Sequence, residues 1–173
     1  KTDAIWVYAK DAANNTVKIP IPLNANIIDV TVPMEANVIA VKKTEIGADR
    51  ELLAPELKVI NNGTNKIEVQ ISGFQTTQTQ NNLNLVVKEK TAVFQADEIA
   101  LFLKEAGTTT FKETNVKEVN TTPLTIGTLN ASGQAGDTAS YTFDAGYHVN
   151  NINVPDGFIR NTLSYHFRIA EGN

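Results

Sequence analysis

The chain of 173 residues contains no cysteine. This absence excludes disulfide bonds, catalysis by a thiolate and metal sites with cysteine ligands. Methionine and tryptophan are nearly absent as well, with one residue each. Cytosolic proteins of this size commonly keep one or two thiols, so the composition favours an exported protein.

An excess of positive charge is also lacking. The formal net charge is -4 and the sequence pI is about 5.2. A mildly acidic surface does not attract phosphate backbones or anionic lipid headgroups. No apolar run approaches the ~18 residues that a membrane-spanning helix needs. We therefore expect no nucleic-acid partner and no membrane insertion.

Common catalytic motifs are missing too. The sequence has no phosphate-binding Gly-rich loop, no Gly-x-Ser-x-Gly, no His-Glu-x-x-His and no calcium loop. A metal site would have to bring His148 and His166 together with Asp144 or Asp156. The simpler interpretation places His166 on the solvent face of a strand and His148 in a polar loop. We expect no catalytic residue, no metal and no cofactor.

What the chain does have is threonine and asparagine, 20 and 19 residues respectively. Threonine suits pleated strands and asparagine suits turns. Apolar residues also recur at every second position in three stripes, which are Ile28/Val30/Val32, Ile67/Val69/Ile71 and Leu163/Tyr165/Phe167/Ile169. Such stripes predict antiparallel sheets with one packed and one solvated face.

Turn residues separate the other candidate strands, which are expected at 4–9, 16–21, 37–41, 57–60, 83–88, 124–129 and 138–143. Between 57–60 and 66–69, Asn62 and Gly63 predict a tight hairpin. Weaker turns are expected around Gly133, Gly136 and Gly146.

Three segments leave alternatives. Residues 96–107 fit a helix that begins at Asp97 and ends before Gly107, or a strand in which Ile99, Leu101 and Leu103 alternate, and we favour the strand. A short helix is possible at 48–53. The polar, uncharged residues 75–82 fit a long exposed loop or solvated edge better than a linker between two half-domains.

These features together predict an all-β chain. About ten short strands, with turns every 8–12 residues, point to an antiparallel β-sandwich of Ig-like or jelly-roll-like topology, with room for one or two short helices. We expect residues 1–173 to form one domain.

Aromatic residues offer a candidate ligand site. Trp6 and Tyr8 share one face of the first predicted strand, and aromatic faces can stack on sugar rings. Burial of that strand on both faces is the competing interpretation. Tyr147 and His148 form a second candidate.

A family resemblance covers most of the chain in outline. Residues 28–33 (Ile-Asp-Val-Thr-Val-Pro), 57–64 and 67–69 resemble a Val-Thr-Val-Pro…Ile-x-Asn-x-Gly pattern of cell-surface and cell-wall-associated modules from Gram-positive bacteria. The outline is similar to WxL cell-wall-binding domains. Here Tyr165, His166 and Phe167 stand in the last strand without a tryptophan, so peptidoglycan binding is not carried over.

Three functions remain. The resemblance and composition imply an extracellular, non-catalytic module of a bacterial cell surface, structural or adhesive, with a protein or glycan partner. The second is a carbohydrate-binding β-sandwich that uses Trp6 and Tyr8. The third is a hydrolase with an unrecognised acid pair or histidine site.

Overall fold

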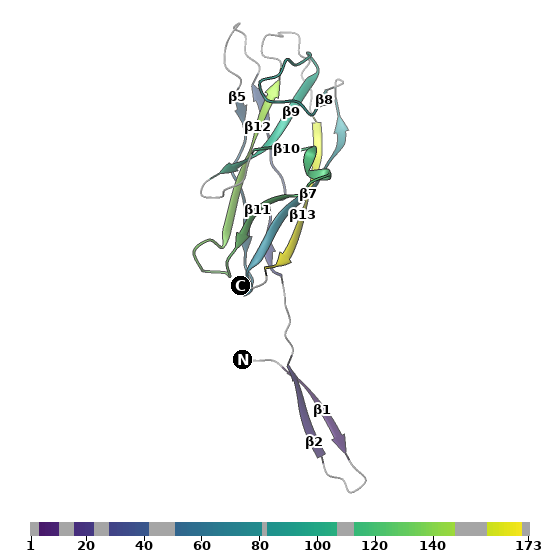
Figure 1. Ribbon diagram of the computed structural model, residues 1–173, viewed down its shortest axis with the longest axis vertical. Helices are drawn as coiled ribbons and strands as arrows, with labels where there is room; N and C mark the ends of the chain where they lie inside the picture. Colours follow the sequence, from purple (N-terminus) through teal and green to yellow (C-terminus); the bar gives the residue numbers. More distant parts are fainter. Residues whose placement is uncertain are drawn as a thin grey trace.

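The computed structural model (Figure 1) describes residues 4–10, 16–22, 28–41, 51–80, 83–106, 113–147 and 159–170, and for 4–10, 16–22, 40, 41 and 51 it describes the backbone alone. The all-β prediction is confirmed. The longest described helix is a single 3-10 turn, η1 (Glu118–Asn120). No helix in these ranges is long and apolar enough to cross a membrane.

Two sheets form the body of the fold. The larger has the strand order β10-β9-β12-β6-β3, with β8 paired in parallel to β9, and the smaller has the order β11-β7-β13. The larger sheet contains β3 (Val30–Thr31), β6 (Leu57–Asn61), β8 (Asn84–Leu85), β9 (Glu98–Ala106), β10 (Thr114–Asn115) and β12 (Thr138–Tyr147). The smaller contains β7 (Ile67–Thr79), β11 (Leu124–Leu129) and β13 (Ile159–Ile169).

Two further pairs of strands make two-stranded sheets of their own. These are β1 (Ala4–Lys10) with β2 (Thr16–Pro22), and β4 (Ile39–Val41) with β5 (Glu51–Leu53). The short helix considered as an alternative at 48–53 is contradicted at its last three residues, which form a strand, while 48–50 lie outside the described residues.

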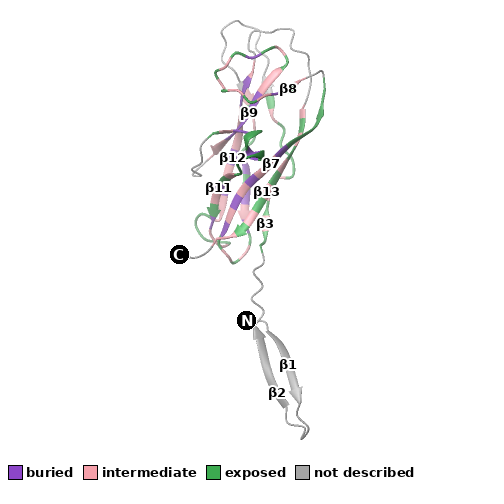
Figure 2. Cartoon of the chain, turned by 45° about the vertical axis from the view of Figure 1, so that its right-hand side comes forward, coloured by how far each residue is buried: buried purple, intermediate pink, exposed green. Residues whose placement is uncertain are grey.

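The core lies between the two large sheets, as expected for a sandwich. Val59 and Tyr141 reach it from the larger sheet, and Val69, Ile71 and Ile126 reach it from the smaller one, each at most 1% exposed. Figure 2 shows buried residues along β7, β9 and β12. Because apolar residues alternate with polar ones, each strand turns one row inward and one row outward.

The predicted hairpin at Asn62 and Gly63 is wrong. β6 pairs with β12 and β3, whereas β7 pairs with β11 and β13, so this connection crosses from one sheet to the other. The fully buried Asn61 holds the crossing: its Nδ2 donates to the carbonyls of Asn65 and Asn130, both at 2.8 Å, and its Oδ1 accepts from the Gly63 N–H.

Other expectations have mixed outcomes. Residues 98–106 form the strand β9, so the strand interpretation of this segment is confirmed. Only Asn84–Leu85 is strand within the expected 83–88. Residues 75–79 belong to β7 rather than to a loop, although they are exposed as predicted. Gly133 and Gly136 occupy turns with φ of 77° and 83°, while Gly146 lies inside β12.

Candidate interaction surface

The sequence singled out four possible ligand-binding residues. Trp6 and Tyr8 lie in β1, in register with Pro20 and Lys18 of β2, but their side chains are outside the described part of the structure, and so is His148. Tyr147 ends β12 in register with Ile99 and packs, half-buried, against the core. The structure therefore gives only Tyr147 a described environment, and that environment is packing.

Of the residues considered for a metal site, His148 and Asp156 lie outside the described residues. His166 lies exposed on the outward face of β13. Asp144 lies on β12 and is held by lysines. Within the described residues, no group of three or more His, Asp or Glu side chains could hold a metal ion.

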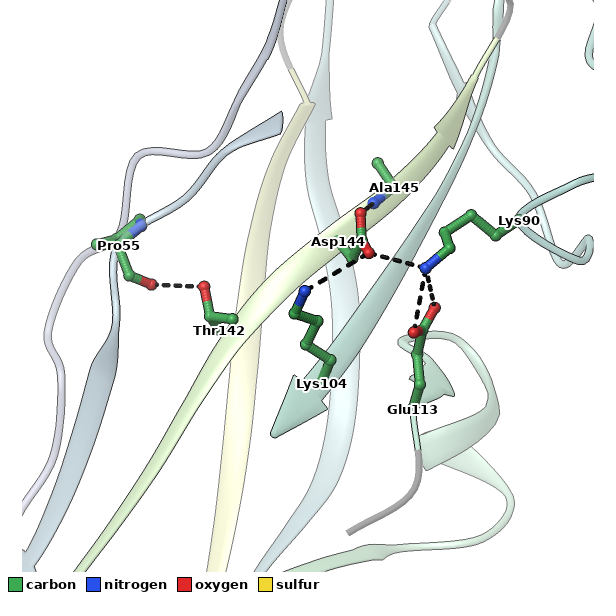
Figure 3. Close-up of polar contacts among 7 residues, drawn as sticks. All are labelled: Pro55, Lys90, Lys104, Glu113, Thr142, Asp144 and Ala145. Atoms are coloured by element: carbon green, nitrogen blue, oxygen red, sulfur yellow. Dashed lines mark hydrogen bonds and ion pairs between the residues drawn. The ribbon is translucent and has the colours of Figure 1, made fainter. Parts of the chain in front are cut away.

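Asp144 is instead the centre of a charged cluster (Figure 3). The Lys90 Nζ lies 2.8 Å from Asp144 Oδ2 and 3.2 Å from the Glu113 carboxylate, and Lys104 Nζ lies 3.8 Å from the same Asp144 oxygen. The three charged partners come from the segment before β9, from β9 itself and from the residue before β10. The cluster thus joins segments that are distant in the sequence.

Hydrogen bonds in this cluster favour the ionised forms of Lys90 and Asp144. The hydrogen bond to Asp144 raises the pKa of Lys90 and outweighs the opposing effect of burial. Partial burial acts to raise the pKa of Asp144, but the hydrogen bonds from Lys90 and from the Ala145 N–H lower it overall. An ammonium held protonated is not a nucleophile, and a carboxylate held ionised is a poor general acid. These groups suit a structural role.

The segment from Val86 to Asp97 is fastened to the outside of the larger sheet beside this cluster. Phe94, 3% exposed, packs with Ala100 and Phe102 in a small second core. Lys88 bonds Glu98 and lies 5.6 Å from the centre of the Phe94 ring. The 86–97 segment can lie this close to β12 because Gly146 has no side chain. A Cβ at Gly146 would lie 2.7 Å from Phe94 Cζ and 2.8 Å from the Lys90 carbonyl oxygen.

A pair of tyrosines connects the two sheets through the core. The hydroxyls of Tyr141, on β12, and Tyr165, on β13, are hydrogen-bonded to each other. Burial raises the pKa of both phenols, so both stay protonated at any physiological pH. The Tyr165 ring also stacks on Phe167 of the same strand, with 6.0 Å between the ring centroids.

The far end of β7 forms a polar ribbon with β13. Residues 75–80, in β7 and its continuation, are exposed at every position (Figure 2), whereas Ile159, the β13 partner of Thr79, packs half-buried against the core. Their pairing partners are residues 159–162 of β13. Thr76 Oγ1 bonds Asn161 Oδ1 at 2.9 Å and Thr77 Oγ1 bonds the Arg160 carbonyl at 3.1 Å. We name residues 75–80 and 159–162 the Gln/Thr ribbon.

The direction of the main-chain groups of β13 follows from two hydrogen bonds. The Ala170 N–H donates to the Lys66 carbonyl at 2.8 Å, and the Arg160 carbonyl accepts from Thr77. Even-numbered residues of β13 therefore turn their main-chain groups toward β7. Since this direction alternates along a strand, the odd-numbered residues turn theirs to the opposite side, the outer edge of β13.

This outer edge is long. β13 has 11 residues, whereas the edge strands of the larger sheet, β3 and β10, have 2 each. The opposite edge of β7 is partly covered, because the Asn120 side chain bonds both the N–H and the C=O of Phe74, at 2.8 and 2.9 Å. Among the described strands, none pairs with the outer edge of β13, where the Asn161 side chain donates to the Ile159 carbonyl at 3.5 Å.

Catalytic motifs and aromatic residues in the sequence predicted neither the Gln/Thr ribbon nor the outer edge of β13. The low-complexity Gln/Thr stretch was visible as a signal, but its strand conformation was not, because uncharged polar residues carry no apolar alternation. Comparison of the chain with family models, curated proteins and solved structures finds no match.

Proposed function

We propose that this chain is a non-catalytic, structural or adhesive module of a bacterial cell surface. The observation that carries the proposal is the Gln/Thr ribbon. A strand usually ends where its residues no longer face the core. β7 instead continues through residues 75–79, all of which are exposed. Strand pairing holds these polar side chains in fixed rows, which lowers the entropy cost of binding a partner.

The chemistry of the described charges supports a module of this kind. Lys90, Asp144 and Glu113 are engaged with one another and fasten a long segment to the sheet. The buried tyrosine pair and Asn61 connect separate parts of the sandwich. A packed sandwich that carries the exposed, polar Gln/Thr ribbon suits a module that displays a binding surface to a partner.

Adhesion tests the proposal directly. Beads coated with the purified chain are placed on intact cells of the bacterium that encodes it, and retention under flow is measured. The ribbon variant carries Gln75→Glu and Gln78→Glu, which place negative charge on exposed positions. The matched control is Gln134→Glu, the same chemical change on the exposed β11–β12 connection. We expect the parent and control beads to be retained and the ribbon variant to be released.

Two further measurements bear on the same proposal. Protease added to intact cells should cleave the chain if it lies on the surface. A panel of metabolites, metals and simple sugars should leave the melting temperature unchanged. Saturable stabilisation by a small metabolite, or parent beads that wash off as readily as uncoated ones, would count against a surface module.

A further inference from the structure

Asn62 and Gly63 are the one Asn-Gly pair in the sequence. An asparagine that precedes glycine is prone to lose its side-chain amide, because glycine has no Cβ to obstruct the approach of its own main-chain nitrogen. In the fold, Asn62 is exposed and follows directly after β6, where the chain crosses to β7. Water, which completes the reaction, therefore has access to this residue.

The reaction forms a ring between the two residues and needs no catalyst. The Gly63 nitrogen attacks Asn62 Cγ, the bond from Cγ to Nδ2 breaks, and ammonia leaves with the proton from the Gly63 nitrogen. Water then opens the succinimide ring at either carbonyl. The product is aspartate or isoaspartate, so a neutral amide becomes a negative charge.

The fold restrains the attacking nitrogen. The Gly63 N–H donates to Asn61 Oδ1 at 3.0 Å. Asn61 is fully buried, and its Nδ2 is bonded to the carbonyls of Asn65 and Asn130, both at 2.8 Å, so its amide group is fixed from both ends. Ring closure requires the Gly63 nitrogen to turn toward Asn62 Cγ and lose its proton, and this breaks the bond to Asn61.

The amide under attack is restrained as well. Asn62 Nδ2 donates to Thr31 Oγ1 at 3.0 Å and to Asp29 Oδ1 at 3.4 Å, and the Asn62 main-chain N–H donates to the Asp29 carbonyl at 2.8 Å. These bonds join Asn62 to β3 and the residue before it. The pairing of β3 with β6 covers two positions, so we expect it to open more readily than the long pairs of the sandwich.

We propose that Asn62 is a deamidation site, which the folded chain protects and which the opening of β3 from β6 exposes. The product then favours the open form. A carboxylate has no N–H to donate to Thr31, and it would lie beside the Asp29 carboxylate, where like charges repel. A transient opening of β3 thus becomes a permanent covalent change. This site is separate from the Gln/Thr ribbon and does not depend on the proposed function.

Peptide mapping by mass spectrometry tests the first half of the proposal. The full chain is incubated at neutral pH, either folded or unfolded in urea, and the replacement of each side-chain –NH2 by –OH is followed in time. In urea, Asn62 should react faster than every other asparagine of the chain. In the folded chain, Asn62 should react at least about tenfold more slowly than in urea, because reaction requires local opening.

Two valine variants test whether the contact with β3 provides this protection. Thr31→Val removes one acceptor of the Asn62 amide at an exposed position and should speed deamidation of the folded chain about fivefold, the value of one hydrogen bond. Thr125→Val is the matched control. Thr125 is also exposed, and its Oγ1 accepts from the side-chain amide of Gln70 at 3.2 Å, away from Asn62. The control should react at the parent rate.

The effect of the product is measured with Asn62→Asp. This variant should raise the equilibrium constant for urea unfolding about fivefold, because the donor to Thr31 is lost. In an Asp29→Asn background the same change should raise it less, since the amide introduced at position 29 can donate to the new carboxylate.

Each measurement has a result that would overturn the proposal. Equal rates for Asn62 in the folded and unfolded chains would show that these contacts do not protect it. Equal acceleration by Thr31→Val and Thr125→Val would mean that global unfolding, rather than opening of β3, exposes the site. An Asn62→Asp variant as stable as the parent would refute the claim that the product favours the open form.

Discussion

Replacement of Gly146 by alanine tests the contact between the 86–97 segment and the larger sheet. In a strand, alanine normally stabilises relative to glycine by about 0.5–1 kcal/mol. Here the new Cβ would lie 2.7 Å from Phe94 Cζ, 2.9 Å from Phe94 Cε2 and 2.8 Å from the Lys90 carbonyl oxygen. Real Cβ atoms do not approach so closely, and one of the three atoms belongs to the backbone. Residues 90–94 must therefore move away from β12.

The cost can be bounded from what that movement disturbs. Overpacking a well-packed site costs about 1–3 kcal/mol, and complete loss of a buried phenylalanine side chain costs about 3–5 kcal/mol. Because Phe94 is 3% exposed, we expect Gly146→Ala to lower the free energy of unfolding by about 2–4 kcal/mol. The sign is opposite to the intrinsic preference for alanine.

Urea unfolding of a double-mutant cycle measures the contact itself. Phe94→Ala removes two of the three close atoms, so Gly146→Ala should cost much less in that background, with a coupling energy of at least about 1 kcal/mol. The parent, both single variants and the double variant are compared by their transition midpoints and slopes. A neutral or stabilising Gly146→Ala, or two costs that simply add, would refute the close packing of Phe94 on β12.

The other predictions concern the core, the charged cluster and the aromatic residues of β1. Tyr165→Phe leaves the hydroxyl of the fully buried Tyr141 without its partner and should lower the free energy of unfolding by about 1–3 kcal/mol; an unchanged midpoint of thermal unfolding would contradict this. The pKa of Asp144 is lower in the folded chain than in the unfolded chain. The ionised Asp144 therefore stabilises the fold above its unfolded pKa, and this contribution is lost as pH falls through its folded pKa. Asp144→Asn should make the free energy of unfolding fall less steeply at acid pH, and an unchanged slope would show that Asp144 does not contribute. Titration with a broad glycan panel should shift the fluorescence of Trp6 if the carbohydrate-binding alternative holds, and an unresponsive Trp6 would remove that site.

The strand content was predictable because apolar alternation is a local property. Ile67, Val69 and Ile71 alternate in the sequence, and in the fold they are at most 1% exposed. The segment at 98–106 was open to two interpretations because its apolar residues fit both periods. Its pairing with β12 along eight positions, from Ser140 with Ala106 to Tyr147 with Ile99, decides for the strand.

Partner choice between strands was not predictable from neighbouring residues. Asn62 and Gly63 have the residue types of a hairpin turn, yet β6 and β7 lie in different sheets. Local turn preference is worth little against the burial of two apolar stripes that face each other across the sandwich. Gly146 was taken for a turn residue for a similar reason: the need for space under Phe94 exists only once a distant segment is packed there.

The sequence by itself determined the class of this protein: strands with one packed face, no thiol chemistry and no common catalytic motif. These properties follow from residue type and period, which act over a few positions along the chain. Only the tertiary structure decided which strands are neighbours, that the Gln/Thr stretch is an exposed strand paired with β13, and that β13 is the last described strand of its sheet. Those features depend on pairings between residues such as Thr79 and Ile159, far apart in the chain, whose energies arise only when the whole sandwich is assembled.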